Sequence, residues 1–246
     1  MKKHLSVFML MARSCIYKIM LIMAAMAAVE IFLTLFLPNP RTQLLYDLID
    51  LSRIRFVYYA AISLAVFTLI SCCSVGSSNP RHTIERLSVS ERWVIVWHWL
   101  TAALALFALW FWQIILLYGI SLWHSLAAES GYISQQSIFL ANFRSDFFHS
   151  VLPLEDMSRL LRNIIMFICM GGVCASSAHK IRRGKKMMFA ALMHLIFLWA
   201  CFAAEAFEAS YDGFLIFAYA LIFVLSIVGV CIGSEEVDYE EATLEN

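Results

Sequence analysis

Four acidic residues lie within or beside long apolar stretches of the chain. Glu30 lies in the first stretch, and Asp212 begins the sixth. Glu205 and Glu208 lie one helical turn apart in the fifth. An ionisable group at membrane depth is costly, so each acid is a functional hypothesis by default. Gathered at one level near the outer face, the four predict an acidic vestibule that attracts a cationic or amphipathic substrate.

A structural interpretation of the same acids remains open. Their carboxylates can pair with arginine side chains. Alternatively, the side chains can snorkel, so that the carboxylates reach the membrane–water interface. The arginines considered for this pairing are Arg53, Arg55 and Arg144.

Two histidines indicate a second possible chemistry, the ligation of haem. His98 and His194 lie at a similar depth in two predicted helices. Two imidazoles at one level on two helices are the axial ligands that a b-type haem requires. The segment 92–102 also resembles the start of a haem helix in membrane cytochrome subunits. The alternative is that each histidine is a core residue whose ring is satisfied by its neighbours.

Signatures of common enzymes are missing from the sequence. There is no phosphate-binding glycine-rich loop, so the chain is not expected to hydrolyse ATP by itself. The HExxH, EExxxR and GxSxG motifs and the Asp-rich signature of head-group transfer are also absent. The seven cysteines follow neither zinc-site nor disulfide spacing. We therefore expect no enzyme activity, no catalytic residue, no metal site and reduced thiols that pack as small apolar side chains.

The elements that position these residues are predicted to be transmembrane helices. Of 246 residues, 62% are apolar and 15% are charged, whereas about 25% are charged in an average soluble domain. Lys and Arg equal Asp and Glu at 18 each, which disfavours nucleic-acid binding. In a bilayer all backbone polar groups need internal hydrogen bonds, which favours helices. The expected fold class is all-α, a polytopic membrane protein.

Six apolar runs are long enough to cross a bilayer, whose core of about 30 Å requires about 20 residues per helix. We predict a single six-helix domain over 1–233, followed by an acidic cytoplasmic tail over 234–246. The runs are 16–37, 56–75, 93–117, 157–178, 187–208 and 212–233.

The distribution of Lys and Arg predicts the orientation of these helices. With the N-terminus in the cytoplasm, the cytoplasmic segments carry 12 of these residues and the outer segments carry 6, among them Arg159 and Arg162. The short basic loop at 179–186 contributes most of this excess, which follows the positive-inside rule. An even number of helices then places both termini in the cytoplasm.

Two connecting segments are predicted to be ordered. In the cytoplasmic segment 76–92, a short amphipathic helix is followed by Ser88 and Glu91, which fit a capping box. This segment is either an interfacial anchor or the contact for a cytoplasmic motor. The residues proposed for a motor contact are Arg81, Glu85, Arg86, Leu87 and Arg92.

The outer segment 134–149 repeats phenylalanine every four residues, at Phe139, Phe143 and Phe147. This spacing predicts an amphipathic helix before the fourth membrane helix. Its apolar stripe serves either packing or the gating of a substrate path. The fourth helix is expected to start after Pro153, with acidic residues in its first turn.

This plan resembles the permease subunits of type-2 ATP-binding-cassette exporters. The segment 83–100 (TIERLSVSERWVIVWHWL) is similar to the loop and third-helix start where such permeases meet their ATPase. The segment 135–163 (QQSIFLANFRSDFFHSVLPLEDMSRLLRN) resembles small permease-like proteins of Gram-positive bacteria.

The resemblance implies a multi-pass protein of the bacterial plasma membrane that exports a hydrophobic, peptide or lipid-like substrate. It also implies a homodimer or a pair with a second permease, and a separate cytoplasmic ATPase through which ATP is used. The chain itself is expected to hold no cofactor. Two alternatives remain: a non-transporting membrane accessory or immunity protein, and a b-type haem membrane subunit.

Overall fold

The structure is a computed structural model, and it describes most of the chain as helix. The described residues are 2–36, 45–72, 90–127, 139–140, 143–154, 156–183, 189–202 and 211–244. They contain no strand, which confirms the all-α class for the described part of the chain. The helices are α1 (Lys2–Leu35), α2 (Leu45–Leu51), α3 (Ile54–Cys72), α5 (Glu91–Ala127), α7 (Asp146–Val151), α8 (Met157–Arg182), α9 (Phe189–Phe202) and α10 (Asp212–Leu244).

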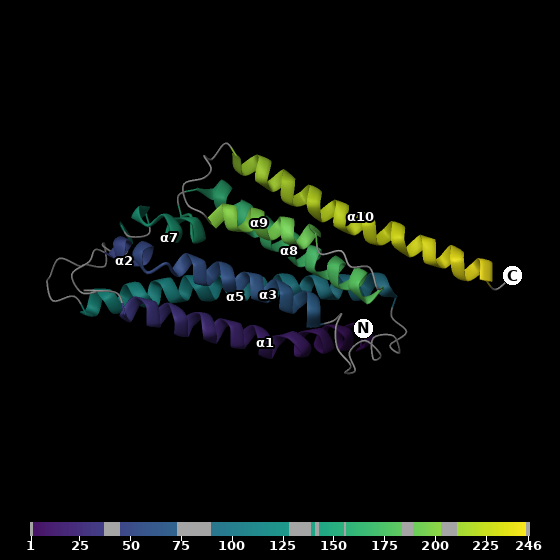
Figure 1. The fold of residues 1–246 in the computed structure, drawn as a ribbon, viewed down its shortest axis with the longest axis horizontal. Coiled ribbons are helices and arrows are strands. Elements are labelled where there is room, and N and C mark those ends of the chain that lie inside the picture. The colour runs from purple at the N-terminus through teal and green to yellow at the C-terminus, as the bar shows by residue number, and fades with distance from the viewer. Residues whose placement is uncertain are drawn as a thin grey trace.

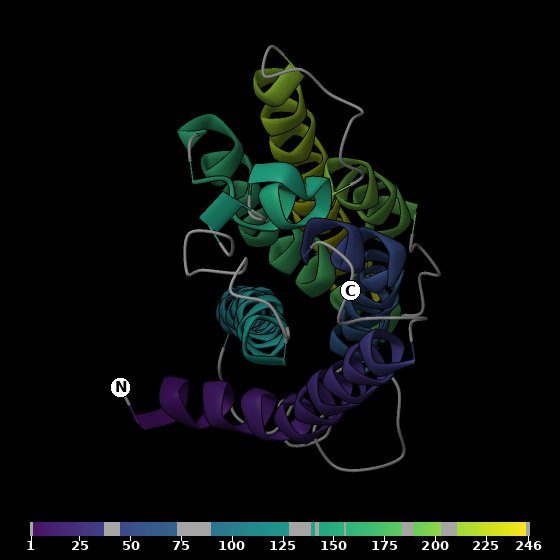
Figure 2. The ribbon, with the colours of Figure 1, turned by 90° about the vertical axis from the view of Figure 1, so that its left-hand side faces the viewer.

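The longer helices lie side by side and alternate in direction along the chain (Figure 1). Helix α1 begins and α10 ends at the same end of the bundle, which we call the terminal end. The short helices α2 and α7 lie at the opposite end, which we call the α2–α7 end. Helices α1 and α10 lie on opposite sides of the bundle (Figures 1 and 2).

Helix α8 is the centre of the bundle and packs against α3, α5, α9 and α10. Small residues along it allow close approach of neighbouring backbones, as in membrane helix packing. A Cβ atom on Gly171 would lie 2.8 Å from the backbone nitrogen of Ala103 on α5. All described residues from Gly171 to His179 are buried.

Among the described residues, four helices are long and apolar enough to cross a membrane, which is the architecture of a membrane protein. They cover Ser6–Leu35, Ile54–Cys72, Glu91–Leu126 and Met157–Arg182. Helix α9 and the apolar part of α10, Asp212–Val228, are shorter. The end of the predicted fifth run, 203–208, lies outside the described residues.

The boundaries of the helices differ from the predicted runs. Helix α1 begins at Lys2, well before the predicted residue 16, so Arg13 and Lys18 lie on a helix. Helix α8 begins at Met157, capped by Asp156, whose side chain accepts from Ser158 N at 3.1 Å. The first turn of α8 holds no acidic residue; Asp156 is the N-cap, and Glu155 lies outside the described residues.

The predicted helix over 134–149 is interrupted where it is described. Ser145 is the N-cap of α7, and its hydroxyl accepts from Phe148 N. Phe143 packs edge-on against Phe139, with ring centroids 4.7 Å apart. Phe147 is buried, whereas Phe139 is exposed, so the phenylalanine stripe divides at the cap of α7. Residues 134–138, 141 and 142 lie outside the described part.

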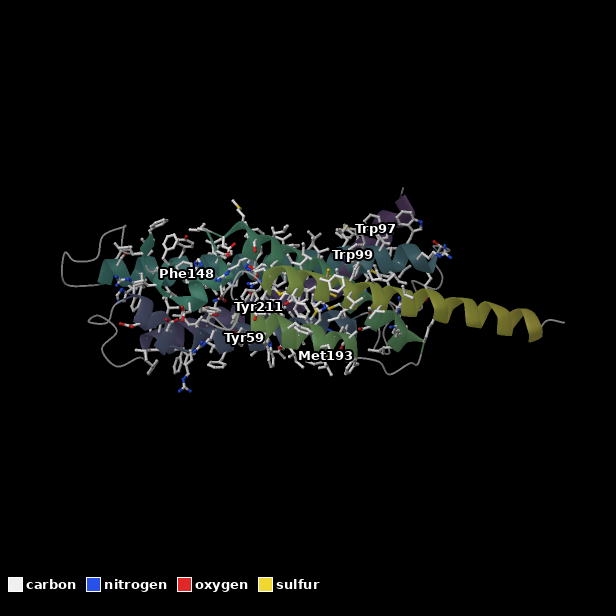
Figure 3. The ribbon with its side chains drawn as sticks, turned by 90° about the horizontal axis from the view of Figure 1, so that it is seen from above. Tyr59, Trp97, Trp99, Phe148, Met193 and Tyr211 are labelled. Atoms are coloured by element: carbon white, nitrogen blue, oxygen red, sulfur yellow. The ribbon has the colours of Figure 1, made fainter. Side chains whose placement is uncertain are left out.

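Aromatic side chains mark both ends of the bundle. Trp97 and Trp99 lie toward the terminal end and Phe148 toward the other end (Figure 3). Trp99 donates from Nε1 to the carbonyl of Ile168 at 2.8 Å, which ties α5 to α8. The five cysteines whose side chains are described, Cys15, Cys72, Cys169, Cys174 and Cys201, are free thiols.

Candidate functional site

An ionic cluster joins the start of α5 to the end of α8 at the terminal end. Glu91 Oε2 accepts from Arg183 Nη2 at 2.6 Å, and Glu91 Oε1 lies 3.0 Å from His179 Nδ1. The acid stands at the positive end of the α5 dipole and the bases at the negative end of the α8 dipole. The attraction between Glu91 and the basic side chains and the dipoles of the two helices therefore favour the same contact.

This cluster lies next to the segment predicted to meet a cytoplasmic motor. Arg92 is exposed beside Glu91 in the first turn of α5. The predicted capping partner Ser88 lies outside the described residues, and the Glu91 carboxylate binds α8. The other predicted motor-contact residues, Arg81, Glu85, Arg86 and Leu87, also lie outside the described residues.

A buried ion pair lies nearer the α2–α7 end. Arg162 Nη1 donates to Asp212 Oδ1 at 2.8 Å, with 4% and 2% of the two side chains exposed. The other carboxylate oxygen of Asp212 accepts from the Ser158 hydroxyl at 2.8 Å. Charge and hydrogen bonds are thus satisfied together, as a buried pair requires.

Further hydrogen bonds connect this ion pair to a network that spans four helices. Arg162 also donates to the side-chain oxygen of Asn163 and to the carbonyl of Cys201 on α9. Asn163 in turn donates to the carbonyl of Ser150 on α7 at 3.0 Å. The cluster therefore holds α7, α8, α9 and α10 together.

The buried ion pair corrects the predicted partner of Asp212. Arg162, which the distribution of Lys and Arg places on the outer side, is 3% exposed on α8. The partner of Asp212 is this arginine and none of the three that were considered.

A second buried carboxylate lies between α1 and α5. Glu30 is 0% exposed, and its Oε2 accepts from Gln113 Nε2 at 3.3 Å. Among the described residues, Glu30 Oε1 and Gln113 Oε1 have no hydrogen-bond partner, nor does the hydroxyl of buried Tyr58 on α3. Within the described part of the chain Glu30 makes no ion pair, unlike Asp212.

The structure places the predicted vestibule acids in separate surroundings. Glu30 faces Gln113, whereas Asp212 faces Arg162, and both carboxylates are buried. Glu205 and Glu208 lie outside the described residues. The vestibule stays a prediction, and the two acids that are described contribute buried helix contacts.

The two predicted haem ligands contact different helices. His98 is buried on α5, and its Nε2 lies 3.1 Å from the carbonyl of Leu69 on α3. The ring of His194 on α9 lies 4.8 Å from the ring of Tyr219 on α10. Both imidazoles are therefore engaged in helix packing. No group of three or more His, Cys, Asp or Glu in the described residues is placed to hold a metal ion.

Two apolar pockets lie along the contact between α1 and α5. One, of about 380 Å³, lies toward the α2–α7 end and includes Thr34, Gly119 and Trp123. The other, of about 350 Å³, lies toward the terminal end and includes Phe8, Met20 and Leu104. Both are suited to apolar groups such as hydrocarbon chains.

The residues that complete these clusters were not selected from the sequence. Gln113 is an uncharged amide inside the third run, so no charge marks it as costly at membrane depth. Arg162 is charged and lies within the fourth run, and it counts with the outer segments in the distribution of Lys and Arg. Its position within an apolar run, with Asp212 at the start of another, is the signal that indicates a buried pair.

Comparison of the chain with family models, curated proteins and solved structures finds no match. The clusters described above are therefore the basis for inferring function.

Proposed function

We propose that the chain is the membrane-spanning permease subunit of a type-2 ATP-binding-cassette exporter in the bacterial plasma membrane. It would work with a separate cytoplasmic ATPase and as a homodimer or a pair with a second permease. The observation that carries this proposal is the ionic contact of Glu91 with His179 and Arg183. This contact joins the predicted ATPase-binding segment to the central helix of the bundle.

The position of this contact supports a coupling role. Helix α5 starts directly after the segment 81–90, so a force on that segment acts on the first turn of α5. Glu91 passes the displacement to the last turn of α8, and α8 packs against four other helices. ATP-driven closure of two ATPases would then rock two permease copies between inward- and outward-facing states.

Six spans are consistent with the alternating helices. Helices α9 and α10 would be the fifth and sixth spans, so that both termini would lie on one side of the membrane, and the positive-inside rule favours the cytoplasm for that side. The basic loop at 179–186 would then lie at the cytoplasmic face.

The pockets along α1 and α5 support a hydrophobic, peptide or lipid-like substrate. Their linings are almost wholly apolar, and both open at the contact between two of the longest helices. An amphipathic substrate could enter such a pocket from the bilayer without passing through water.

The test is co-purification from native membranes of the wild-type chain and of variants in the motor-contact segment. We expect the wild type to recover an ATPase subunit, and Arg86→Glu and Arg92→Glu to reduce that recovery at least tenfold. Arg159→Glu at the other end of the bundle is the control and should recover the wild-type amount. If the wild type recovers no ATPase, the accessory-protein alternative replaces this proposal.

A further inference from the structure

Glu30 and Gln113 face each other with complementary but incomplete hydrogen bonds. One bond is present, from Gln113 Nε2 to Glu30 Oε2 at 3.3 Å. The two remaining oxygens, Glu30 Oε1 and Gln113 Oε1, are buried acceptors without a donor in the described part of the chain. An ionised carboxylate can only accept hydrogen bonds, so it cannot satisfy the amide oxygen.

The neighbouring groups do not supply the missing donor. Helices α3 and α5 pack against α1, and the titratable group that α3 places near Glu30 is Tyr58. The Tyr58 hydroxyl itself has no partner. The hydroxyl of Thr34 donates to the backbone carbonyls of Glu30 and Ile31. The described residues offer Glu30 no cationic partner.

We propose that Glu30 and Gln113 form a binding site for one proton within the membrane bundle. The proton sits on Glu30 Oε1, and the resulting O–H donates to Gln113 Oε1. Together with the existing N–H···O bond, this gives two hydrogen bonds between a carboxylic acid and a carboxamide. One proton thereby satisfies two buried acceptors and removes an unpaired buried charge.

Proton binding at this site would control how α1 is held. Helix α1 packs chiefly on α3 and α5, and a second polar contact to α5 is Trp112 Nε1 donating to the Met23 carbonyl at 3.1 Å. Loss of the proton would leave a carboxylate against an amide oxygen and weaken the α1–α5 contact. This inference does not depend on the proposed transport function.

Infrared spectroscopy of the purified protein in lipid nanodiscs tests the proposal. We expect a carbonyl band of a protonated carboxylic acid at neutral pH that disappears at alkaline pH. The band should shift when glutamate side chains carry carbon-13, and it should be lost in Glu30→Gln. Gln113→Leu should shift it to higher frequency, because the carbonyl loses its donor. Asp156→Asn, which removes a partly exposed carboxyl outside the Glu30 site, should leave it unchanged.

Three outcomes would overturn the proposal. The wild type could lack the band at neutral pH, or the band could persist in Glu30→Gln. The band could also be present in choline buffer and absent in sodium or potassium, which would show a metal-cation site in place of a proton site. If Glu30→Gln does not fold, the pH titration and isotope shift of the wild type decide.

Discussion

Arg162 and Asp212 show what one charge pair contributes inside an apolar bundle. Removing one partner leaves the other charge buried and unpaired, at a cost of about 3–5 kcal/mol. We expect Arg162→Met to lower the free energy of unfolding by this amount, measured by denaturant titration in detergent micelles. The double variant Arg162→Met with Asp212→Leu should lose less than the single variant, because no charge is then left alone.

A nearby pair provides the matched control. Arg159, one turn earlier on α8, pairs with Asp156 at 3.1 Å, with 25% and 27% of the side chains exposed. Water weakens such a pair, so Arg159→Met should cost less than about 1 kcal/mol. Equal losses for the two arginines would show that burial does not strengthen the Arg162 contact.

Asp50 on α2 predicts a pH dependence at the α2–α7 end. Burial raises the pKa of its carboxyl, and the hydrogen bond from the Ser145 hydroxyl at 3.1 Å opposes that rise. Because the folded pKa is raised, stability from this group is present at low pH and is lost as pH rises through the folded value. We expect Asp50→Asn to be more stable than wild type at neutral pH and to lack this dependence. The measurement is the denaturation midpoint as a function of pH across the acidic range. The same pH dependence in wild type and Asp50→Asn would contradict this prediction.

Single residues were the hardest feature to predict from the sequence. The membrane depth of Glu30 follows from its place in an apolar run. Its partner Gln113 is 83 positions away, and only the packing of α1 on α5 brings them together. The buried state of Arg162 likewise depends on α10, which supplies the opposing charge.

At the scale of elements, the close packing of α8 on α5 depends on a residue without a side chain. A Cβ atom on Gly171 would meet the Ala103 backbone at 2.8 Å, so Gly171→Ala has to push the two helices apart. We expect a loss of about 1–3 kcal/mol in the free energy of unfolding.

The control for this packing lies on α5. A Cβ atom on Gly119 would meet nothing within 4 Å, so Gly119→Ala should stabilise by about 0.5–1 kcal/mol through helix propensity alone. If both substitutions destabilised the protein, the loss in Gly171→Ala would come from a general effect of alanine on these helices and not from the α8–α5 contact.

Helices with strong apolar runs were predicted well, and local boundaries were not. The cores of α1, α3, α5 and α8 follow directly from runs of about 20 apolar residues. The described part of the predicted helix at 134–149 is interrupted at Ser145, because a serine hydroxyl can cap a new helix as readily as it can face solvent. Periodicity alone does not distinguish these outcomes.

For the whole molecule, the arrangement predicts which end faces the cytoplasm. Arg92 and Leu126 are exposed at opposite ends of α5. In a background without native cysteines, Leu126→Cys should react with an impermeant thiol reagent in intact cells. Arg92→Cys should react only after permeabilisation. The reverse pattern would invert the bundle and place the predicted ATPase contact outside the cell.

In the proposed mechanism, Glu91 transmits force from an ATPase to the bundle. The direct measurement is ATP turnover by the co-purified ATPase in nanodiscs containing wild type, Glu91→Lys, or Glu91→Lys with Arg183→Glu. We expect Glu91→Lys to bind the ATPase but to lose its coupling to the permease, and we expect the charge swap to restore part of that coupling. Wild-type turnover in Glu91→Lys, or no ATPase bound to the wild type, would show that Glu91 does not have this role.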